Sequence, residues 1–327
     1  MKRARALPLL IAVLIALVAI GGSLLVGAAA IPLERVFATL LGAGRSSERS
    51  IVVDLRLPRA LLAGLAGGGL AVSGATFQAM LRNPLAEPYI LGVSGGAALG
   101  AVIVTVFTRN YFALPFAALA GALITIAIVF TIAARATLRL DPRVLLLAGV
   151  IVGAFFQAII LLLLTFADVE SFRSAIFWMM GSVASASWRS VMMLAVIVVP
   201  ATLALFALAR PLNLLTSGEE TALYLGVNVT SVMRASYFTA SLLVATSVAA
   251  CGSIGFVGLV VPHAVRMLWG SDHRIVIPTA FFVGSAFLVL ADTTARTILA
   301  PAELPVGVVT ALVGVPVFIM LLMRRAA

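Results

Sequence analysis

Residues 235–265, ASYFTASLLVATSVAACGSIGFVGLVVPHAV, determine how many membrane-crossing helices the sequence predicts. The stretch contains no Asp, Glu, Lys or Arg, whereas one helix needs only about 20 apolar residues to cross a bilayer. The stretch is therefore too long for a single crossing. Cys251–Gly255 (CGSIG) interrupts it with two glycines, and glycine weakens a helix interior. We expect two helices here, the second of them short and ending near Gly270.

The composition of the whole chain predicts that lipid surrounds most of it. The 327 residues are 63% hydrophobic and only 10% charged, with a mean hydropathy of +1.20. A soluble domain carries about 25% charged residues, so a water-soluble fold is excluded. Nine stretches lack Asp, Glu, Lys and Arg: 6–33, 60–81, 88–108, 110–134, 144–167, 190–209, 235–265, 275–291 and 304–323.

Basic residues gather at both ends of the chain, in Lys2–Arg5 and at Arg324 and Arg325. The positive-inside rule places both ends in the cytoplasm, so the number of crossings must be even. Dividing the interrupted stretch raises nine segments to ten. We predict an all-α polytopic membrane protein with ten transmembrane helices, N-in and C-in, and a single transmembrane domain over 1–327.

The sequence argues against catalysis by this chain. Lys2 is the sole lysine, so the chain has no Walker A lysine and cannot be its own ATPase. His263 and His273 are ten residues apart, and no Cys or carboxylate cluster completes a metal site around them. We expect no catalytic residue, no metal and no cofactor in this chain. The net charge of +10 reflects topology and attraction to anionic lipid, so no nucleic-acid partner is expected.

Two segments depart from regular helix. Asn83–Pro88 (NPLAEP) is bounded by prolines, which stop a helix from running through it. The second is the glycine-rich segment 252–263. Each could be a tight loop with small-residue packing, or a broken helix that lines a pathway. Because the two follow helices of opposite direction, they also suggest an inverted repeat of helices 2–5 and 7–10.

The longest internal loop between basic flanks predicts a short helix on the cytoplasmic face. Thr216 or Ser217 can cap it, Glu219 and Glu220 suit its first turn, and Gly226 can end it. Such a helix offers a surface to a soluble partner. The alternative is a helix that lies on the lipid headgroups.

Three arginines are expected at the external ends of helices. Arg56 and Arg59 precede the second helix, and Arg296 follows the ninth. They could pair within the chain, Arg59 with Asp54 and Arg296 with Asp292 at i,i+4 spacing. Alternatively, they could dock an acidic partner through charge-assisted hydrogen bonds.

The order of these segments resembles the permease subunits of ATP-binding-cassette importers for ferric siderophores, haem and cobalamin, a FecCD-like family of type II importers. The similarity covers nearly the whole chain. Its motifs are LRLPR (55–59), SGATFQAMLRNPLAEPYILGVSGGA (73–97), LLLAGV (145–150), FWMMGS (177–182), GEETALYLGV (218–227), GSIGFVGLVVPHAVR (252–266), SDHR (271–274), AD (291–292) and ELPVGVVTALVGVPVF (303–318).

The resemblance implies a homodimer with the pathway at its interface, in the bacterial inner (cytoplasmic) membrane. It also implies two cytoplasmic ABC ATPase subunits, which hold the ATP and Mg²⁺, and a periplasmic substrate-binding protein. Asn83 and Leu85 resemble a cytoplasmic gate, and residues 211–228 resemble coupling helices. The implied ATPase-coupling residues are Ser217, Gly218, Glu219, Glu220, Leu225 and Gly226. The implied residues for binding-protein docking are Arg56, Arg59 and Arg296.

The predicted function is translocation of an iron chelate, haem or a ferric siderophore, by ATP-driven alternating access. A cobalamin permease of the same family is the nearest alternative. A proton- or ion-driven secondary transporter is the alternative from another class, and it would need ionisable residues near mid-bilayer. Here Asp292 and Glu303 fall at helix ends. A structural or assembly membrane protein without transport activity is the remaining alternative.

Overall fold

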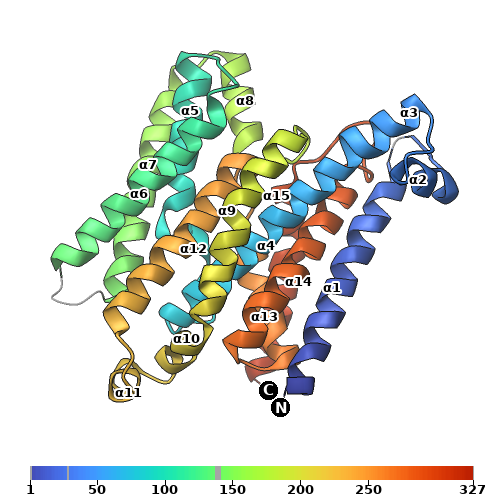
Figure 1. Cartoon of the computed structure of the whole chain (residues 1–327). Helices are drawn as coiled ribbons and strands as arrows, with labels where there is room; N and C mark the ends of the chain where they lie inside the picture. Colours follow the sequence, from blue (N-terminus) through green and yellow to red (C-terminus); the bar gives the residue numbers. More distant parts are fainter. Residues whose placement is uncertain (1, 28, 137–140, 327) are drawn as a thin grey trace.

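The computed structural model describes residues 2–27, 29–136 and 141–326, which form a bundle of helices (Figure 1). In chain order the elements are α1 (Lys2–Leu25), α2 (Leu33–Leu40), α3 (Ser46–Arg49), the π-helical η1 (Ser50–Arg56), α4 (Leu57–Met80), the 3₁₀ turn η2 (Pro88–Leu91), α5 (Val93–Phe107), α6 (Leu114–Ala136), α7 (Pro142–Thr165), α8 (Val169–Met179), α9 (Trp188–Ala207), α10 (Ala209–Thr216), α11 (Glu219–Tyr224), α12 (Val229–Cys251), α13 (Val257–Trp269), α14 (His273–Ala295) and α15 (Val306–Ala326).

Seven of the described helical segments are long and apolar enough to cross a membrane: α1, the continuous segment from α3 to α4, α6, α7, α9, α12 and α14. α5, α13 and α15 provide shorter apolar segments. These ten coincide with the ten predicted segments, although the number of crossings and their orientation stay predictions. Both termini lie at one end of the bundle with α10 and α11, which we call the terminal end (Figure 1). We call the opposite end, with α2 and α8, the far end.

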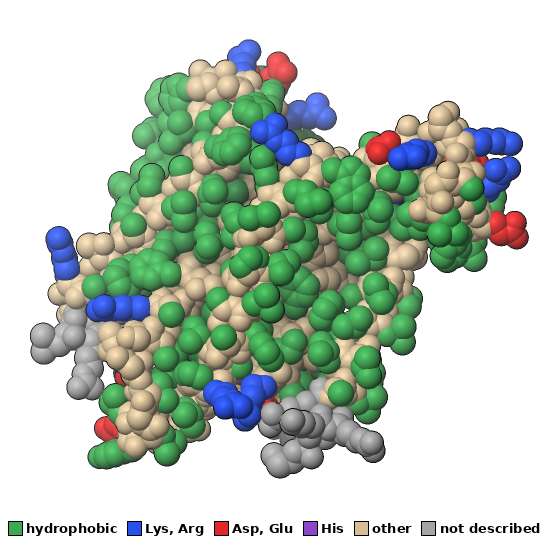
Figure 2. Space-filling view, viewed as in Figure 1, with side chains coloured by type: hydrophobic (Ala, Val, Ile, Leu, Met, Phe, Trp, Pro, Cys, Tyr) green, Lys and Arg blue, Asp and Glu red, His purple; other side chains and the backbone are tan. Residues whose placement is uncertain are grey.

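The outer surface agrees with a membrane environment. Apolar side chains cover the flank of the bundle, and most of the visible Lys, Arg, Asp and Glu side chains gather towards its two ends (Figure 2). A lipid-facing surface needs this distribution, because a charged side chain is costly in hydrocarbon.

α4 lies at the centre of the bundle and packs against α9, α12, α13 and α14. Its close contacts depend on glycine: a Cβ added at Gly74 would lie 1.8 Å from the carbonyl oxygen of Gly258, and one added at Gly67 would lie 2.3 Å from that of Gly284. Small residues let helix backbones approach in this way inside membranes. Among the seven long segments, those of α4 and α12 are the least apolar and the most buried.

The predicted interruption of residues 235–265 is confirmed. α12 ends at Cys251, an irregular segment follows over 252–256, and α13 begins at Val257. At about 1.5 Å per residue, the 13 residues of α13 and the 15 of α5 are shorter than the hydrocarbon core of about 30 Å. Backbone that is not α-helical therefore adjoins both short helices: 81–92, which includes the 3₁₀ turn η2, before α5, and 252–256 before α13.

The two halves of the chain repeat one order of elements. α4 to α7 run as a long helix, an irregular segment, a short helix and two further helices, and α12 to α15 do the same. The inverted repeat of helices 2–5 and 7–10 stays a prediction. The segment between α1 and α4 is largely helical because α2, α3 and η1 form within it.

Candidate functional site

The turn after α4 holds the predicted gate residues in a defined conformation. The side-chain oxygen of Asn83 accepts a hydrogen bond from the N–H of Leu85 (2.9 Å), and its N–H donates to the carbonyl of Gln78 (3.1 Å). Asn83 thus closes an Asx turn that the following Pro84 rigidifies. The side chain of Leu85 is 43% exposed, so the turn presents an apolar side chain to the outside of the single chain.

The predicted coupling residues form one exposed tip at the terminal end. Ser217 and Gly218 connect α10 to α11, Glu219 and Glu220 start α11, and Leu225 and Gly226 follow it. Tyr224 and Leu225 are 91% and 61% exposed.

The predicted N-cap of α11 is wrong: Gly218 occupies the N-cap position with φ +121°, and neither Thr216 nor Ser217 caps α11. The expected end is confirmed, because Gly226 follows the C-cap residue with φ +80° and donates to the carbonyl of Leu223.

An ion pair links the turn after α4 to this tip. The guanidinium of Arg82 lies 3.4 Å from the carboxylate of Glu219. The sequence analysis did not single out Arg82. The one feature of the local sequence that could have drawn attention to it is its position directly before the NPLAEP motif. The two partners are 137 residues apart in the chain, so no spacing pattern predicts the pair.

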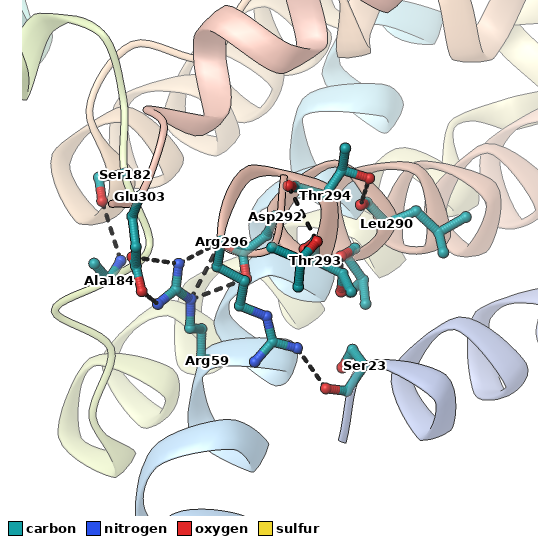
Figure 3. A network of polar contacts seen from close by, with 12 residues as sticks. Ser23, Arg59, Ser182, Ala184, Leu290, Asp292, Thr293, Thr294, Arg296 and Glu303 are labelled. Carbon is teal, nitrogen blue, oxygen red and sulfur yellow. Dashed lines mark hydrogen bonds and ion pairs between the residues drawn. The ribbon is translucent and has the colours of Figure 1, made fainter. Parts of the chain in front are cut away.

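The three predicted docking arginines come together at the far end. Arg59 is held by two carboxylates, Asp292 at 2.9 Å and Glu303 at 3.0 Å (Figure 3). Arg296 donates to the carbonyl of Ser23 (Figure 3). Arg56 is buried and donates to the carbonyls of Leu24 (2.6 Å) and Ala29. We call Arg56, Arg59, Arg296, Asp292 and Glu303 the far-end cluster.

The partners of these arginines differ from those that the sequence suggested. Arg59 pairs with Asp292 and Glu303 rather than with Asp54, and Arg296 forms a backbone hydrogen bond. The side chain of Asp292 is 5% exposed and that of Glu303 is 43% exposed. Burial lowers the pKa of Arg296. Three arginines and two carboxylates give the far-end cluster itself a formal charge of one positive unit, and the docking role stays a prediction.

The described residues do not assemble a metal site. No group of three or more His, Cys, Asp and Glu residues converges within that part of the chain. His273 is buried, with Nδ1 2.7 Å from the side-chain oxygen of Asn213. His263 is also buried and meets the ring of Phe318 edge-on, with centroids 6.2 Å apart.

A comparison with protein families matches residues 12–324 to the FecCD transport family. The chain belongs to the FecCD transport family. The resemblance seen in the sequence is therefore confirmed. As a member of this membrane-embedded family of ABC permeases, the chain is the permease component of an ABC importer, a transport component rather than an ATPase.

FecCD relatives of different substrate match the chain about equally. The hemin transport system permease protein HmuU of Yersinia pestis is 41% identical over 281 residues, 84% of each chain. The vitamin B12 import system permease protein BtuC of Escherichia coli is 42% identical over 277 residues, 84% of this chain and 83% of its own. An inward-facing metal-chelate type ABC transporter aligns over 97% of this chain and 98% of its own, with 32% identity and a TM-score of 0.88.

Proposed function

We propose that this chain conducts an iron chelate, haem or a ferric siderophore, across the bacterial inner membrane. The observation that carries the proposal is the alignment of 97% of the chain with a metal-chelate type ABC transporter. The 41% identity to a hemin permease supports the same substrate class. Two copies would enclose the pathway, and alternating access at their interface would move the substrate.

The ATPase partner follows from the tip at the terminal end. The fully buried Ala222 anchors α11 against the bundle, while Tyr224 and Leu225 project from it. Exposed aromatic and aliphatic side chains on a small, anchored helix suit insertion into a groove of a soluble partner. We assign this partner as an ABC ATPase, with one ATPase per permease copy. ATP and Mg²⁺ would bind to the ATPase, and this chain would bind neither.

The far-end cluster supports a periplasmic binding protein as the second partner. Glu303 is the exposed member of the pair of carboxylates on Arg59, so an acidic group of a partner could take its place. Repetition in a homodimer would give two such positions, which suit a partner with two acidic lobes. Charge complementarity of this kind mainly sets the association rate and the orientation.

Proteoliposomes that contain the permease, its ATPase and its binding protein test the proposed substrate. We expect ATP-dependent accumulation of hemin or of a ferric siderophore, and no effect of an ionophore that collapses ion gradients. Accumulation without ATP, driven by a proton or sodium gradient, would establish the secondary transporter instead. The absence of uptake for every chelate tested would contradict the substrate class.

Cobalamin is the second candidate, because the 42% identity to the vitamin B12 permease is as high as the 41% identity to the hemin permease. The same vesicles distinguish the two. Saturable, ATP-dependent uptake of cyanocobalamin with no uptake of iron chelates would replace the first proposal while leaving the permease mechanism unchanged.

A further inference from the structure

The two irregular segments of the bundle are hydrogen-bonded to each other. The N–H of Phe256 donates to a carboxylate oxygen of Glu87, and the N–H of Ile254 donates to the hydroxyl of Tyr89, each at 2.8 Å. Near them, the hydroxyl oxygens of Ser94 and Ser253 are 3.0 Å apart. Segment 81–92 therefore contacts the interruption between α12 and α13 at residues 254 and 256, and the start of α5 contacts it at residue 253.

These contacts satisfy backbone groups that the interruption leaves without helical partners. α13 starts at Val257, and the N–H groups around a helix start have no acceptor within their own helix. A buried N–H group without a partner is unfavourable. An N-cap side chain normally supplies the acceptor, but α13 has no side-chain cap. Glu87 and Tyr89 serve instead, from positions 169 and 165 residues away in the chain.

The interruption is also strained and tightly enclosed. Phe256 has φ +69°, a left-handed conformation that is rare for a bulky side chain. A Cβ added at Gly314 of α15 would lie 2.6 Å from the Cβ of Phe256, and one added at Gly258 would lie 2.7 Å from the ring of Pro88. Strained backbone persists only where its surroundings fix it, and it concentrates at functional sites.

The same segment carries the predicted gate. Asn83 and Leu85 lie four and two residues before Glu87 within the proline-bounded turn, and Arg82 joins that turn to α11. Contacts that fix the position of Glu87 therefore also fix the positions of the gate residues Asn83 and Leu85.

We propose that Glu87 and Tyr89 are positioning residues that join the gate to the α12–α13 interruption, so that the two irregular segments move as one unit during transport. This inference rests on the proposed function for the gate, but the contacts themselves can be tested without any substrate.

The first test measures hydrogen exchange at the amide of Phe256 in the full permease–ATPase complex. Glu87→Gln keeps an acceptor oxygen of the same reach, so we expect protection as in the unaltered chain. Glu87→Ala removes the acceptor, and we expect exchange at least tenfold faster. Equal exchange in all three proteins would overturn the proposal.

The second test asks whether the contact positions the gate or only stabilises the fold. Leu85→Cys should crosslink between two permease copies in a nucleotide-dependent way. We expect Glu87→Ala to remove this dependence and Glu87→Gln to retain it. If Glu87→Ala lowers the unfolding temperature but leaves the nucleotide dependence intact, the residue is merely structural and the positioning role is wrong.

A disulfide tests whether the segments move together. Ser94→Cys with Ser253→Cys, in a Cys251→Ala background, places two thiols where hydroxyl oxygens now lie 3.0 Å apart, within reach of a disulfide. We expect the oxidised protein to take up hemin or cyanocobalamin as fast as its reduced form. Transport that stops on oxidation and returns with reductant would show that the segments separate, against the proposal.

The control for the disulfide is the Leu85→Cys crosslink, which should stop transport because it fixes the gate itself. If that crosslink forms in no nucleotide state, or the unaltered complex moves neither probe, the proposed gate or substrate is wrong. The exchange measurement at Phe256 then still decides the contact to Glu87.

Discussion

The guanidinium of Arg82 lies 3.4 Å from the carboxylate of Glu219, which joins the turn after α4 to the short helix α11. Asn83 follows Arg82 directly, and Glu219 begins the helix that carries Tyr224. The pair therefore connects the predicted gate to the predicted ATPase contact. Both side chains are partly exposed, so the pair can break and re-form at a small energetic cost, about 0.2–1 kcal/mol.

We expect Arg82→Glu to lower the amount of substrate moved per ATP hydrolysed, because two like charges would then separate the turn from α11. The double variant Arg82→Glu with Glu219→Arg restores the attraction and should restore the ratio. The unfolding temperature should hardly change, because exposed ion pairs contribute little to stability. Uptake and ATP hydrolysis measured in the same proteoliposomes give the ratio.

The matched control is Arg109→Glu, which reverses the charge in an exposed ion pair with Asp168, at the loop before α8. This change should leave the ratio unaltered. A ratio that is unaffected by Arg82→Glu, or that the double variant does not recover, would show that the pair has no part in coupling.

The far-end cluster predicts unequal effects of its two carboxylates on stability. The side chain of Asp292 is 5% exposed, and its loss leaves Arg59 in a buried setting with one partner fewer. Breaking a buried ion pair costs about 3–5 kcal/mol, so Asp292→Ala should clearly lower the unfolding temperature in detergent. Glu303→Ala removes a carboxylate that is 43% exposed and should cost less than about 1 kcal/mol. Equal losses would contradict this division.

Glu303 also allows a cleaner test of docking than reversal of the arginines, which would disturb folding. In Glu303→Gln the amide competes less strongly than a carboxylate with an acidic partner for Arg59, so the partner should bind more tightly. If the exposed ion pair between Arg59 and Glu303 is worth about 1 kcal/mol, the affinity should rise by up to about fivefold. Binding of the periplasmic partner to the permease in nanodiscs measures this. Glu34→Gln, an exposed carboxylate on α2, is the control and should change nothing. Unchanged or weaker binding to Glu303→Gln would remove Arg59 from the docking surface.

The tip at the terminal end predicts an ATPase contact that can be removed without unfolding the permease. Leu225 is 61% exposed, so Leu225→Asp should leave the unfolding temperature unchanged. It should reduce ATPase association about tenfold or more, as expected for an interface side chain worth over about 1.4 kcal/mol. Leu41→Asp changes an 86% exposed leucine just after α2 and serves as the control. Retention of the ATPase by Leu225→Asp would place the contact elsewhere.

Asp168 predicts a pH dependence confined to acid. The pKa of this N-cap carboxyl is lowered to about 2, chiefly by the hydrogen bond from the N–H of Ser171. Desolvation opposes the shift, and the hydroxyl of Ser171 and the guanidinium of Arg109 add to it. Because the pKa is lower in the folded than in the unfolded chain, where it is about 3.8, the stabilisation is complete above about pH 4. It is lost as the pH falls towards 2.

We therefore expect the unfolding temperature of the unaltered chain to fall more steeply between pH 4 and pH 2 than that of Asp168→Asn. Asparagine still caps the helix start but does not titrate. Thermal unfolding in detergent at a series of pH values measures the difference. Parallel curves for the two proteins would mean that the carboxylate of Asp168 contributes no such stability.

The sequence was sufficient for the approximate positions of the ten apolar segments, because a stretch without charged residues indicates a helix that can lie in lipid. It did not predict α2, α3, η1 and α8. The CGSIG break ends α12 where the pattern placed it. The capping residue of α11 was mispredicted because Thr216 lies in α10, and a glycine in a left-handed turn starts α11 without a side-chain acceptor. A capping pattern identifies residue types that favour a helix start, but it does not show whether such a residue already belongs to the preceding helix.

Contacts between residues far apart in the chain could not be predicted from the sequence. Arg59 meets Asp292 across 233 residues, and Glu87 meets Phe256 across 169. The sequence suggested Asp54 for Arg59 because Asp54 is a carboxylate only five residues away in the chain, and a sequence pattern can point only to such near neighbours. The choice between them is made by the packing of α4 against α14, which no charge pattern encodes.

The central position of α4 and α12 has a consequence for how the protein enters its membrane. A segment partitions from the translocon into lipid according to its own apolarity, yet these two long segments are the least apolar and the most buried. The glycines that let α4 contact α13 and α14 are the residues that weaken its independent insertion. We therefore expect α4 and α12 to leave the translocon together with neighbouring helices, so that the centre of the bundle is completed last, after its lipid-facing wall is in place.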